Sequence, residues 1–310
     1  MIPLMVRMLF VFMFSCVFVG HGGAAERIPV FVSIVPQKFF VQQIGKDLVA
    51  IQVMVQPGAS PATYEPKPKQ MAEISKAAIY FSIGVPFENA WLSKVSAANP
   101  GMKVVPTDHG IEKLHMAAHH HHEEGGHHEM VDAYHEKGEH GEAHRHAHGG
   151  LDPHIWLSPP LVKIQARTIM AALQAIDPAH GSVYEANYQR FASTIDELDT
   201  QLKQTFTGRK GLQFMVFHPA WGYFAHAYGL EQVPIEIEGK NPKPAQLQRL
   251  VERARTSKIN VIFVQPQFSA KSAEQIAEAI HGQVLPANPL AEDWAANLRT
   301  VAEKFKAALR

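Results

Sequence analysis

Cysteine is almost absent from this chain of 310 residues, and neither sign of charge is in excess. The single cysteine, Cys16, lies close to the N-terminus, so the rest of the chain can form neither a disulfide nor a thiolate metal site. Lys plus Arg and Asp plus Glu number 29 each, so there is no basic excess of the kind that binds nucleic acid, and we expect no nucleic-acid partner. The longest apolar run, Leu9–Val19, is too short to span a membrane comfortably.

The N-terminal segment has the pattern of a signal peptide. Arg7 precedes the apolar run, and small residues follow it, with Gly23 and Ala25 suited to cleavage after Ala25. We therefore predict a signal peptide over residues 1–25 and a mature protein outside the cytoplasm. Cys16 could be a lipidation site or an apolar filler of this segment. Because the bulky Phe14 stands two positions before it, we favour the second interpretation and expect no lipid anchor.

Short apolar runs alternate with helical patterns along the rest of the chain. The predicted strands are Val30–Val35, Ile51–Val55, Ile79–Ile83, Lys103–Val105, Leu212–Phe217, Val233–Ile237, Val261–Gln265 and Gln283–Leu285. The predicted helices are Gln37–Ile44, Lys67–Lys76, Phe87–Ala97, Pro219–Tyr228, Pro244–Ser257, Ala270–His281 and Glu292–Leu309. This alternation predicts an α/β protein with two lobes, each a roughly four-stranded parallel sheet flanked by helices.

Two helical segments separate the two groups of strands. Ser158 is expected to cap the first, and Ser182 begins a capping-box pattern in the second. A helix from Ser182 to Phe206 is about 37 Å long at roughly 1.5 Å per residue, so it can join the lobes rigidly, or it can be an ordinary packed helix. The predicted units are an amino-terminal lobe (26–176), a connecting long helix (177–207) and a carboxy-terminal lobe (208–310).

Residues 115–150 contain little that could be buried, and we predict a mobile histidine-rich loop there. Of the 19 histidines in the chain, twelve lie between His115 and His148, together with seven acidic residues. Neutral imidazole is a preferred ligand of zinc, copper and nickel, so this composition predicts metal capture. An expression tag and a tract without a role are the alternatives. The predicted capture residues are His115, His119, His120, His121, His122, His127, His128, His144, His146 and His148.

Two further histidines lie in well-defined settings. His154 is held by Pro153 just before a helix, and His218 follows a buried strand. Ligands bind at the carboxyl ends of the strands in open parallel sheets, so two facing sheets would bring these histidines into one cleft. Taken singly, each could equally be a core histidine with a structural hydrogen bond. The sequence contains no His-Glu-x-x-His pattern and no phosphate-binding loop, which argues against a metal-dependent hydrolase.

Four motifs, in this order, resemble one known family. They are Pro57-Gly58-Ala59-Ser60-Pro61-Ala62-Thr63-Tyr64-Glu65-Pro66, Asp152-Pro153-His154-Ile155-Trp156, Phe217-His218-Pro219-Ala220-Trp221-Gly222-Tyr223-Phe224, and Asn288-Pro289-Leu290 with Asp293-Trp294. The chain is similar to the periplasmic zinc- and manganese-binding proteins of ABC importers, the ZnuA/TroA-like group. The resemblance implies a periplasmic, monomeric solute-binding protein that is not an enzyme. It would carry Zn²⁺, with Mn²⁺ or another divalent metal as the alternative, to an ABC transporter permease.

The chain departs from the family pattern at two ligand positions. Ala62 stands where a histidine is usual, and Asn288 stands where an aspartate is usual. Only His154 and His218 therefore carry over as ligands, whereas zinc takes about four donors. Glu65 with a water molecule is our favoured completion. The amide oxygen of Asn288 and a loop histidine are the alternatives. A periplasmic zinc buffer without an importer would show the same residues.

Overall fold

The computed structural model describes residues 27–116, 150–236 and 240–309. The predicted signal peptide and all the predicted capture histidines except His115 lie outside the described residues. Within the described ranges, no helix combines the length and the apolar character that a membrane crossing needs.

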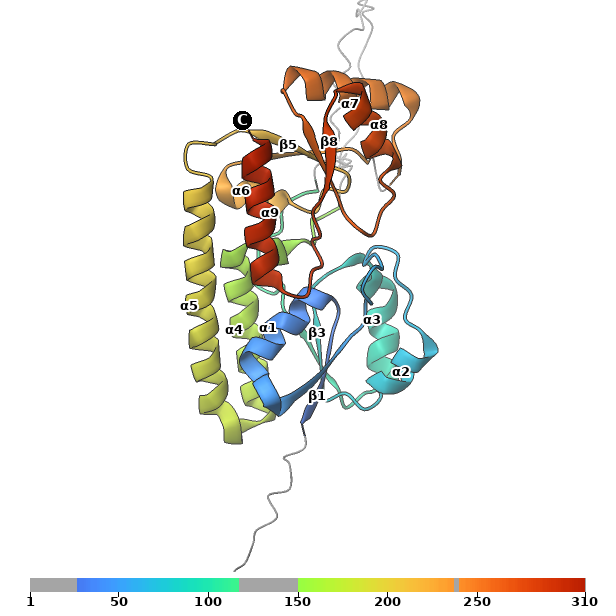
Figure 1. Ribbon diagram of the computed structural model, residues 1–310. Helices are drawn as coiled ribbons and strands as arrows, with labels where there is room; N and C mark the ends of the chain where they lie inside the picture. Colours follow the sequence, from blue (N-terminus) through green and yellow to red (C-terminus); the bar gives the residue numbers. More distant parts are fainter. Residues whose placement is uncertain (1–26, 117–149, 237–239, 310) are drawn as a thin grey trace, which may run out of the picture.

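Two four-stranded parallel sheets form the centres of the two lobes (Figure 1). The first has the order β2-β1-β3-β4 and the second the order β6-β5-β7-β8. The central strands β1, β3, β5 and β7 are rich in β-branched and aromatic residues and are largely buried, as expected for sheets covered on both faces, whereas the edge strands are more exposed. The α/β prediction is thus confirmed. The strand bounds are β1 Ile28–Val32, β2 Val49–Val53, β3 Ile79–Ser82, β4 Lys103–Pro106, β5 Gln213–Val216, β6 Glu231–Pro234, β7 Val261–Val264 and β8 Gln283–Pro286.

Helices follow the strands in the predicted places. Several carry proline in the first turn, where the missing N–H has no intrahelical partner to lose. The helices of the two lobes are α1 Val35–Gly45, α2 Pro68–Ile74, α3 Pro86–Ala98, α6 Gly222–Tyr228, α7 Pro244–Thr256 and α8 Lys271–Ala279, with a short 3₁₀ turn at Lys46–Leu48.

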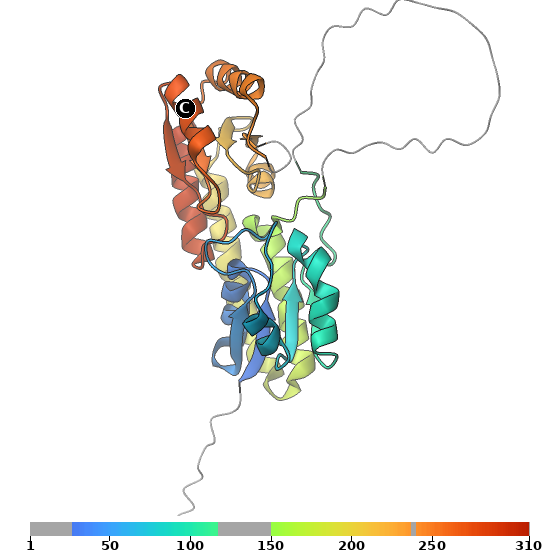
Figure 2. The ribbon, with the colours of Figure 1, turned by 90° about the vertical axis from the view of Figure 1, so that its right-hand side faces the viewer.

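A long helix connects the lobes, as the sequence predicts. α5 (Gly181–Thr205) follows α4 (Pro159–Ile176) and a 3₁₀ turn (Pro178–His180), and it runs along both lobes (Figures 1 and 2). Asn187 donates a hydrogen bond to the Ile44 carbonyl in the first lobe, and Asp199 accepts one from Tyr228 in the second. These bonds fix the helix to both lobes.

The predicted caps of these helices do not form. Ser158 stands at the N-cap of α4, but its side chain makes no capping hydrogen bond. Ser182 lies inside α5, because the preceding 3₁₀ turn leads directly into a helix that begins at Gly181.

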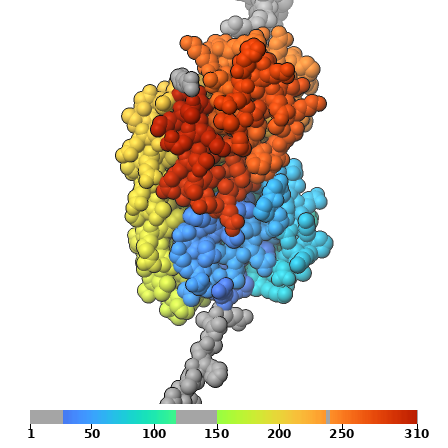
Figure 3. Space-filling model, viewed as in Figure 1, coloured from blue at the N-terminus to red at the C-terminus, as the bar shows by residue number. Residues whose placement is uncertain are grey.

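The last helix, α9 (Trp294–Ala308), makes a second connection that the sequence did not reveal. Trp294 is buried against α1 and α5, with its ring centroid 5.2 Å from that of Phe40 and 6.4 Å from that of Phe191. One hydrophobic core therefore continues from the first lobe through α5 and α9 into the second. In the space-filling view, the carboxy-terminal lobe (orange to red) lies directly on the amino-terminal one (Figure 3). This shared core opposes hinge motion between the lobes.

Candidate metal site

His218 stands at the point where the strand order of the second sheet reverses. It comes two residues after β5, which pairs with β6 on one side and β7 on the other. Gln265, just after β7, fixes the His218 backbone twice: it accepts from the His218 N–H at 3.1 Å and donates to the carbonyl at 2.6 Å. Such a reversal is where open parallel sheets bind ligands.

His154 lies in the tight segment that leads into the 3₁₀ turn Ile155–Leu157. Asp152 Oδ1 accepts hydrogen bonds from the His154 backbone N–H at 2.9 Å and from ring Nδ1 at 2.7 Å. Trp156 fixes the same segment to the second lobe: its indole donates to the Pro289 carbonyl at 2.7 Å, and its own carbonyl accepts from Trp294 Nε1 at 2.6 Å. The segment is held on both sides, so the imidazole has a defined direction.

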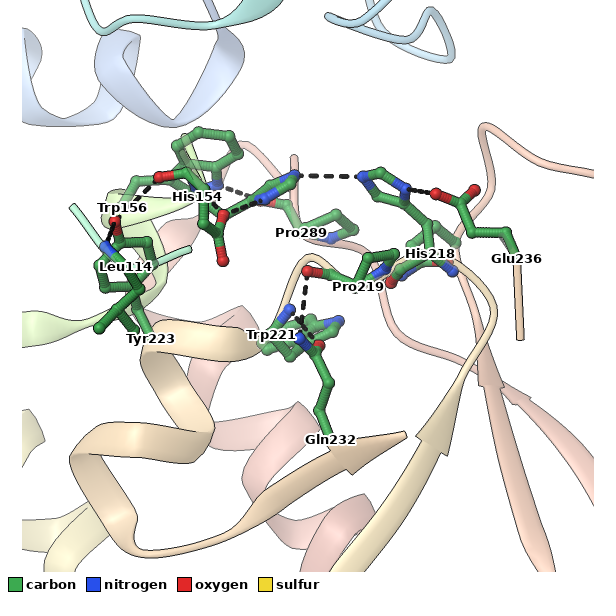
Figure 4. A network of polar contacts seen from close by, with 12 residues as sticks. Leu114, His154, Trp156, His218, Pro219, Trp221, Tyr223, Gln232, Glu236 and Pro289 are labelled. Carbon is green, nitrogen blue, oxygen red and sulfur yellow. Dashed lines mark hydrogen bonds and ion pairs between the residues drawn. The ribbon is translucent and has the colours of Figure 1, made fainter. Parts of the chain in front are cut away.

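The two imidazoles meet between the lobes. His154 Nε2 and His218 Nε2 are 3.3 Å apart, and the far nitrogen of His218, Nδ1, lies 2.7 Å from Glu236 Oε1 (Figure 4). Each Nδ1 thus faces a carboxylate oxygen, which can only accept. Both Nδ1 atoms therefore carry hydrogen, and in the neutral rings both Nε2 atoms present lone pairs to each other. A proton or a metal cation between the two nitrogens would remove the repulsion between these lone pairs.

Burial keeps His154 neutral. The residue is 8% exposed and its ring packs beside Trp156. This desolvation lowers the pKa of the His154 imidazole, although nearby Asp152 acts in the opposite direction. Asp152 and Glu236 are also buried. Buried carboxylates on the outer nitrogens orient metal-binding imidazoles and increase their basicity.

Both histidines line a cavity of about 70 Å³. Apart from the histidines its walls are mainly apolar, with Ala62, Val85, Pro86, Met116, Phe268 and Leu290 among the lining residues. In the part of the chain that the structure describes, no group of three or more His, Cys, Asp or Glu side chains could hold a metal. The described residues thus offer two nitrogen donors and an open, apolar space.

The other predicted ligands lie outside this lining. Glu65 is exposed in the loop that follows β2. The Asn288 side-chain oxygen accepts from the Leu290 N–H at 3.0 Å and from Gln267 Nε2 at 3.3 Å, beside a neighbouring cavity. His115 is exposed and pairs with Leu151 in an isolated antiparallel bridge. Their roles as ligands stay predictions.

Tyr223 connects Leu114, which lies just before the histidine-rich segment, to the metal site. Its hydroxyl accepts from the Leu114 N–H at 2.9 Å and donates to the Asp152 carbonyl at 2.8 Å. Burial raises the pKa of Tyr223 to about 12, so the hydroxyl keeps its proton at neutral pH. Leu114 and Asp152 also pair directly, through the Asp152 N–H and the Leu114 carbonyl at 2.7 Å. The two ends of the segment therefore meet next to His154.

Three residues of the site were not singled out from the sequence as functional. Asp152 could have been suspected, because an acidic residue two positions before a histidine can reach its ring. Glu236 and Gln265 lie 18 and 47 residues after His218, and no local pattern marks either of them.

The fold and the geometry define a two-lobed α/β binding protein with its site between the lobes. The chain belongs to the ZnuA family, described as the periplasmic zinc-uptake complex component A, which matches residues 30–308. Membership confirms the family resemblance seen in the sequence motifs and the prediction of a transport component rather than an enzyme.

Relatives and solved structures agree with this assignment. The high-affinity zinc uptake system protein ZnuA of Bacillus subtilis is 28% identical over 270 residues, which cover 86% of this chain and 79% of that protein. Its counterpart from Brucella abortus is 28% identical over 296 residues, covering 88% and 87%. A crystal structure of ZnuA superposes with a TM-score of 0.81 at 40% identity, covering 92% of this chain and 100% of that one. A zinc-bound ZnuA deletion mutant gives 0.79 at 39% identity, covering 92% and 98%.

Proposed function

We propose that this protein captures Zn²⁺ in the periplasm between its lobes, through Nε2 of His154 and His218, and delivers it to the permease of an ABC importer. The observation that supports this most is the 3.3 Å separation of the two Nε2 atoms, with each Nδ1 on a buried carboxylate. Tetrahedral zinc with Zn–N bonds of about 2.0–2.1 Å sets two ligand nitrogens roughly 3.3–3.4 Å apart. An ion coordinated linearly by two nitrogens would hold these nitrogens farther apart.

The charges of the site suit a divalent ion. Two neutral imidazoles bring no charge of their own, and the carboxylates of Asp152 and Glu236 stand behind them, each 2.7 Å from an Nδ1. Both buried carboxylates would attract bound Zn²⁺ through the rings that hold it. Metal held weakly by the histidine-rich segment would then pass to this fixed pair of histidines, because the two ends of that segment meet next to His154.

Zinc titration against a chromophoric chelator tests capture. We expect His154→Ala and His218→Ala each to remove the tightest zinc equivalent, while the weaker binding of the histidine-rich segment persists. His226→Ala is the matched control, because His226 is an exposed histidine on α6. A double His154→Ala/His218→Ala variant that keeps the tightest equivalent would refute capture by this pair.

Delivery needs a test in cells. A strain that lacks this chain is grown in zinc-depleted medium and complemented with the wild-type or the double variant. We expect rescue by the wild type alone, and only while the importer permease is present. Rescue that persists without the permease would indicate a periplasmic zinc buffer instead.

A further inference from the structure

Met116 lines the same cavity as His154 and His218, which places a methionine among the residues around the two imidazoles. Resting on the histidine pair of the proposed function, we infer that the cleft also binds Cu(I), with the Met116 thioether as a third donor beside the two Nε2 atoms. Thioether sulfur favours Cu(I), whereas zinc in proteins is bound by thiolate sulfur, imidazole nitrogen and carboxylate oxygen. The protein would then accept a soft monovalent ion at the site that it uses for zinc.

The backbone around Met116 directs its side chain inward. Leu114–Met116 pairs antiparallel with Gly150–Asp152: the Met116 N–H donates to the Gly150 carbonyl at 3.0 Å, and the Asp152 N–H donates to the Leu114 carbonyl at 2.7 Å. Side chains alternate between the two sides of an extended segment. His115 is exposed, whereas Leu114 packs against the core and Met116 lines the cavity. The pairing that fixes Asp152 therefore also fixes the Met116 backbone beside the metal site.

The Met116 side chain is suited to following an ion into the cavity. Methionine has three rotatable bonds and a polarizable sulfur, so a fixed backbone still lets the sulfur adjust its position. Ser60 and Gln267 also line the cavity and offer oxygen donors, which suit harder ions. The sulfur is therefore the donor in this wall that distinguishes a soft ion from zinc.

The spacing of the two imidazoles explains why Cu(I) needs this third donor. A linear ion with two bonds of about 2.0–2.1 Å holds its nitrogens about 4.0–4.2 Å apart. The two Nε2 atoms are closer, at 3.3 Å. Three bonds of that length at about 120° set two nitrogens about 3.5–3.6 Å apart, so a shift of about 0.2–0.3 Å suits the pair to a three-coordinate ion. Met116 would supply the third bond.

Cu(I) affinity is measured for the full chain by competition with a chromophoric Cu(I) chelator, under ascorbate and without oxygen. The double His154→Ala/His218→Ala variant gives the background of the other donors, including the histidine-rich segment. Met116→Leu nearly keeps the volume and removes the sulfur. We expect it to lose at least about tenfold in Cu(I) affinity, since loss of even an outer-shell partner costs about 10- to 100-fold. Its zinc affinity should stay within about twofold of wild type, because thioether sulfur is not a usual zinc ligand.

Two further measurements make the test specific to this sulfur. Met71→Leu removes a thioether from α2, outside the cavity, and is the matched control that should bind both ions as wild type does. X-ray absorption at the copper edge is recorded with one equivalent of Cu(I). We expect a sulfur neighbour together with nitrogen neighbours in the wild type, and nitrogen neighbours alone in Met116→Leu.

Unchanged Cu(I) affinity in Met116→Leu, or a wild-type spectrum without a sulfur neighbour, overturns the inference. An equal loss of Cu(I) and zinc affinity in Met116→Leu also overturns it, because the residue would then support the shape of the site rather than select the metal. If the double variant keeps tight zinc, the proposed function fails, and the inference fails with it. If the double variant loses zinc while Met116→Leu binds Cu(I) as wild type does, the zinc site stands and only the copper ligand is refuted.

Discussion

Glu236→Gln tests how far the buried carboxylate behind His218 controls the metal. The two groups are joined by a 2.7 Å contact between Nδ1 and Oε1, and Glu236 is 6% exposed. Hydrogen bonds to charged groups contribute about 1.5–3 kcal/mol. At about 1.4 kcal/mol per factor of ten, this corresponds to roughly a 12- to 140-fold loss of zinc affinity. Loss of an outer-shell partner typically weakens metal binding about 10- to 100-fold, which overlaps this range.

The assay is chelator competition for zinc, corrected by the double His154→Ala/His218→Ala variant. Thermal unfolding of the metal-free proteins shows whether Glu236→Gln perturbs the fold itself. Glu231→Gln is the matched control, because Glu231 is an exposed glutamate at the start of β6, the strand that leads to Glu236. A zinc affinity of Glu236→Gln within twofold of wild type would refute the idea that this carboxylate supports the ligand.

Four further measurements probe the rest of the site. Zinc affinity should fall as pH drops below about 6.5, where ordinary imidazoles take up protons. Since burial lowers the pKa of His154, this residue stops binding zinc at a lower pH than an ordinary histidine would. Tight binding unchanged at about pH 4.5 would contradict histidine ligation. Tyr223→Phe removes the bond to the Asp152 carbonyl, so zinc should dissociate faster in stopped-flow chelation, with α-helical circular dichroism unchanged. Trp294→Ala should lower the free energy of unfolding by about 3–5 kcal/mol in denaturant titration, because a fully buried aromatic leaves a cavity. Glu65→Ala decides the predicted ligand role of Glu65: ligation requires a clear loss of zinc affinity, and unchanged affinity removes it from the ligand set.

The apolar runs determined the sheets without help from the tertiary structure. A strand such as Ile79–Ser82, buried at every position, must be covered on both faces, and the helical patterns between such runs supply the cover. The stripe of apolar residues in α5 likewise required a long packed helix. These are local properties with a fixed period, so the sequence displays them directly.

The tertiary structure alone decided which side chains meet. His154 and His218 are 64 residues apart in the sequence. Their contact depends on the relative position of the two lobes, which are joined by α5 and α9. The bond from Trp294 to the Trp156 carbonyl spans 138 residues, and the Glu236 carboxylate reaches His218 from the segment just after β6. No periodicity encodes such pairs, because they follow from strand order and from the packing of elements distant in the chain. The sequence identified the two histidines as candidate ligands, but only the fold brings their rings together.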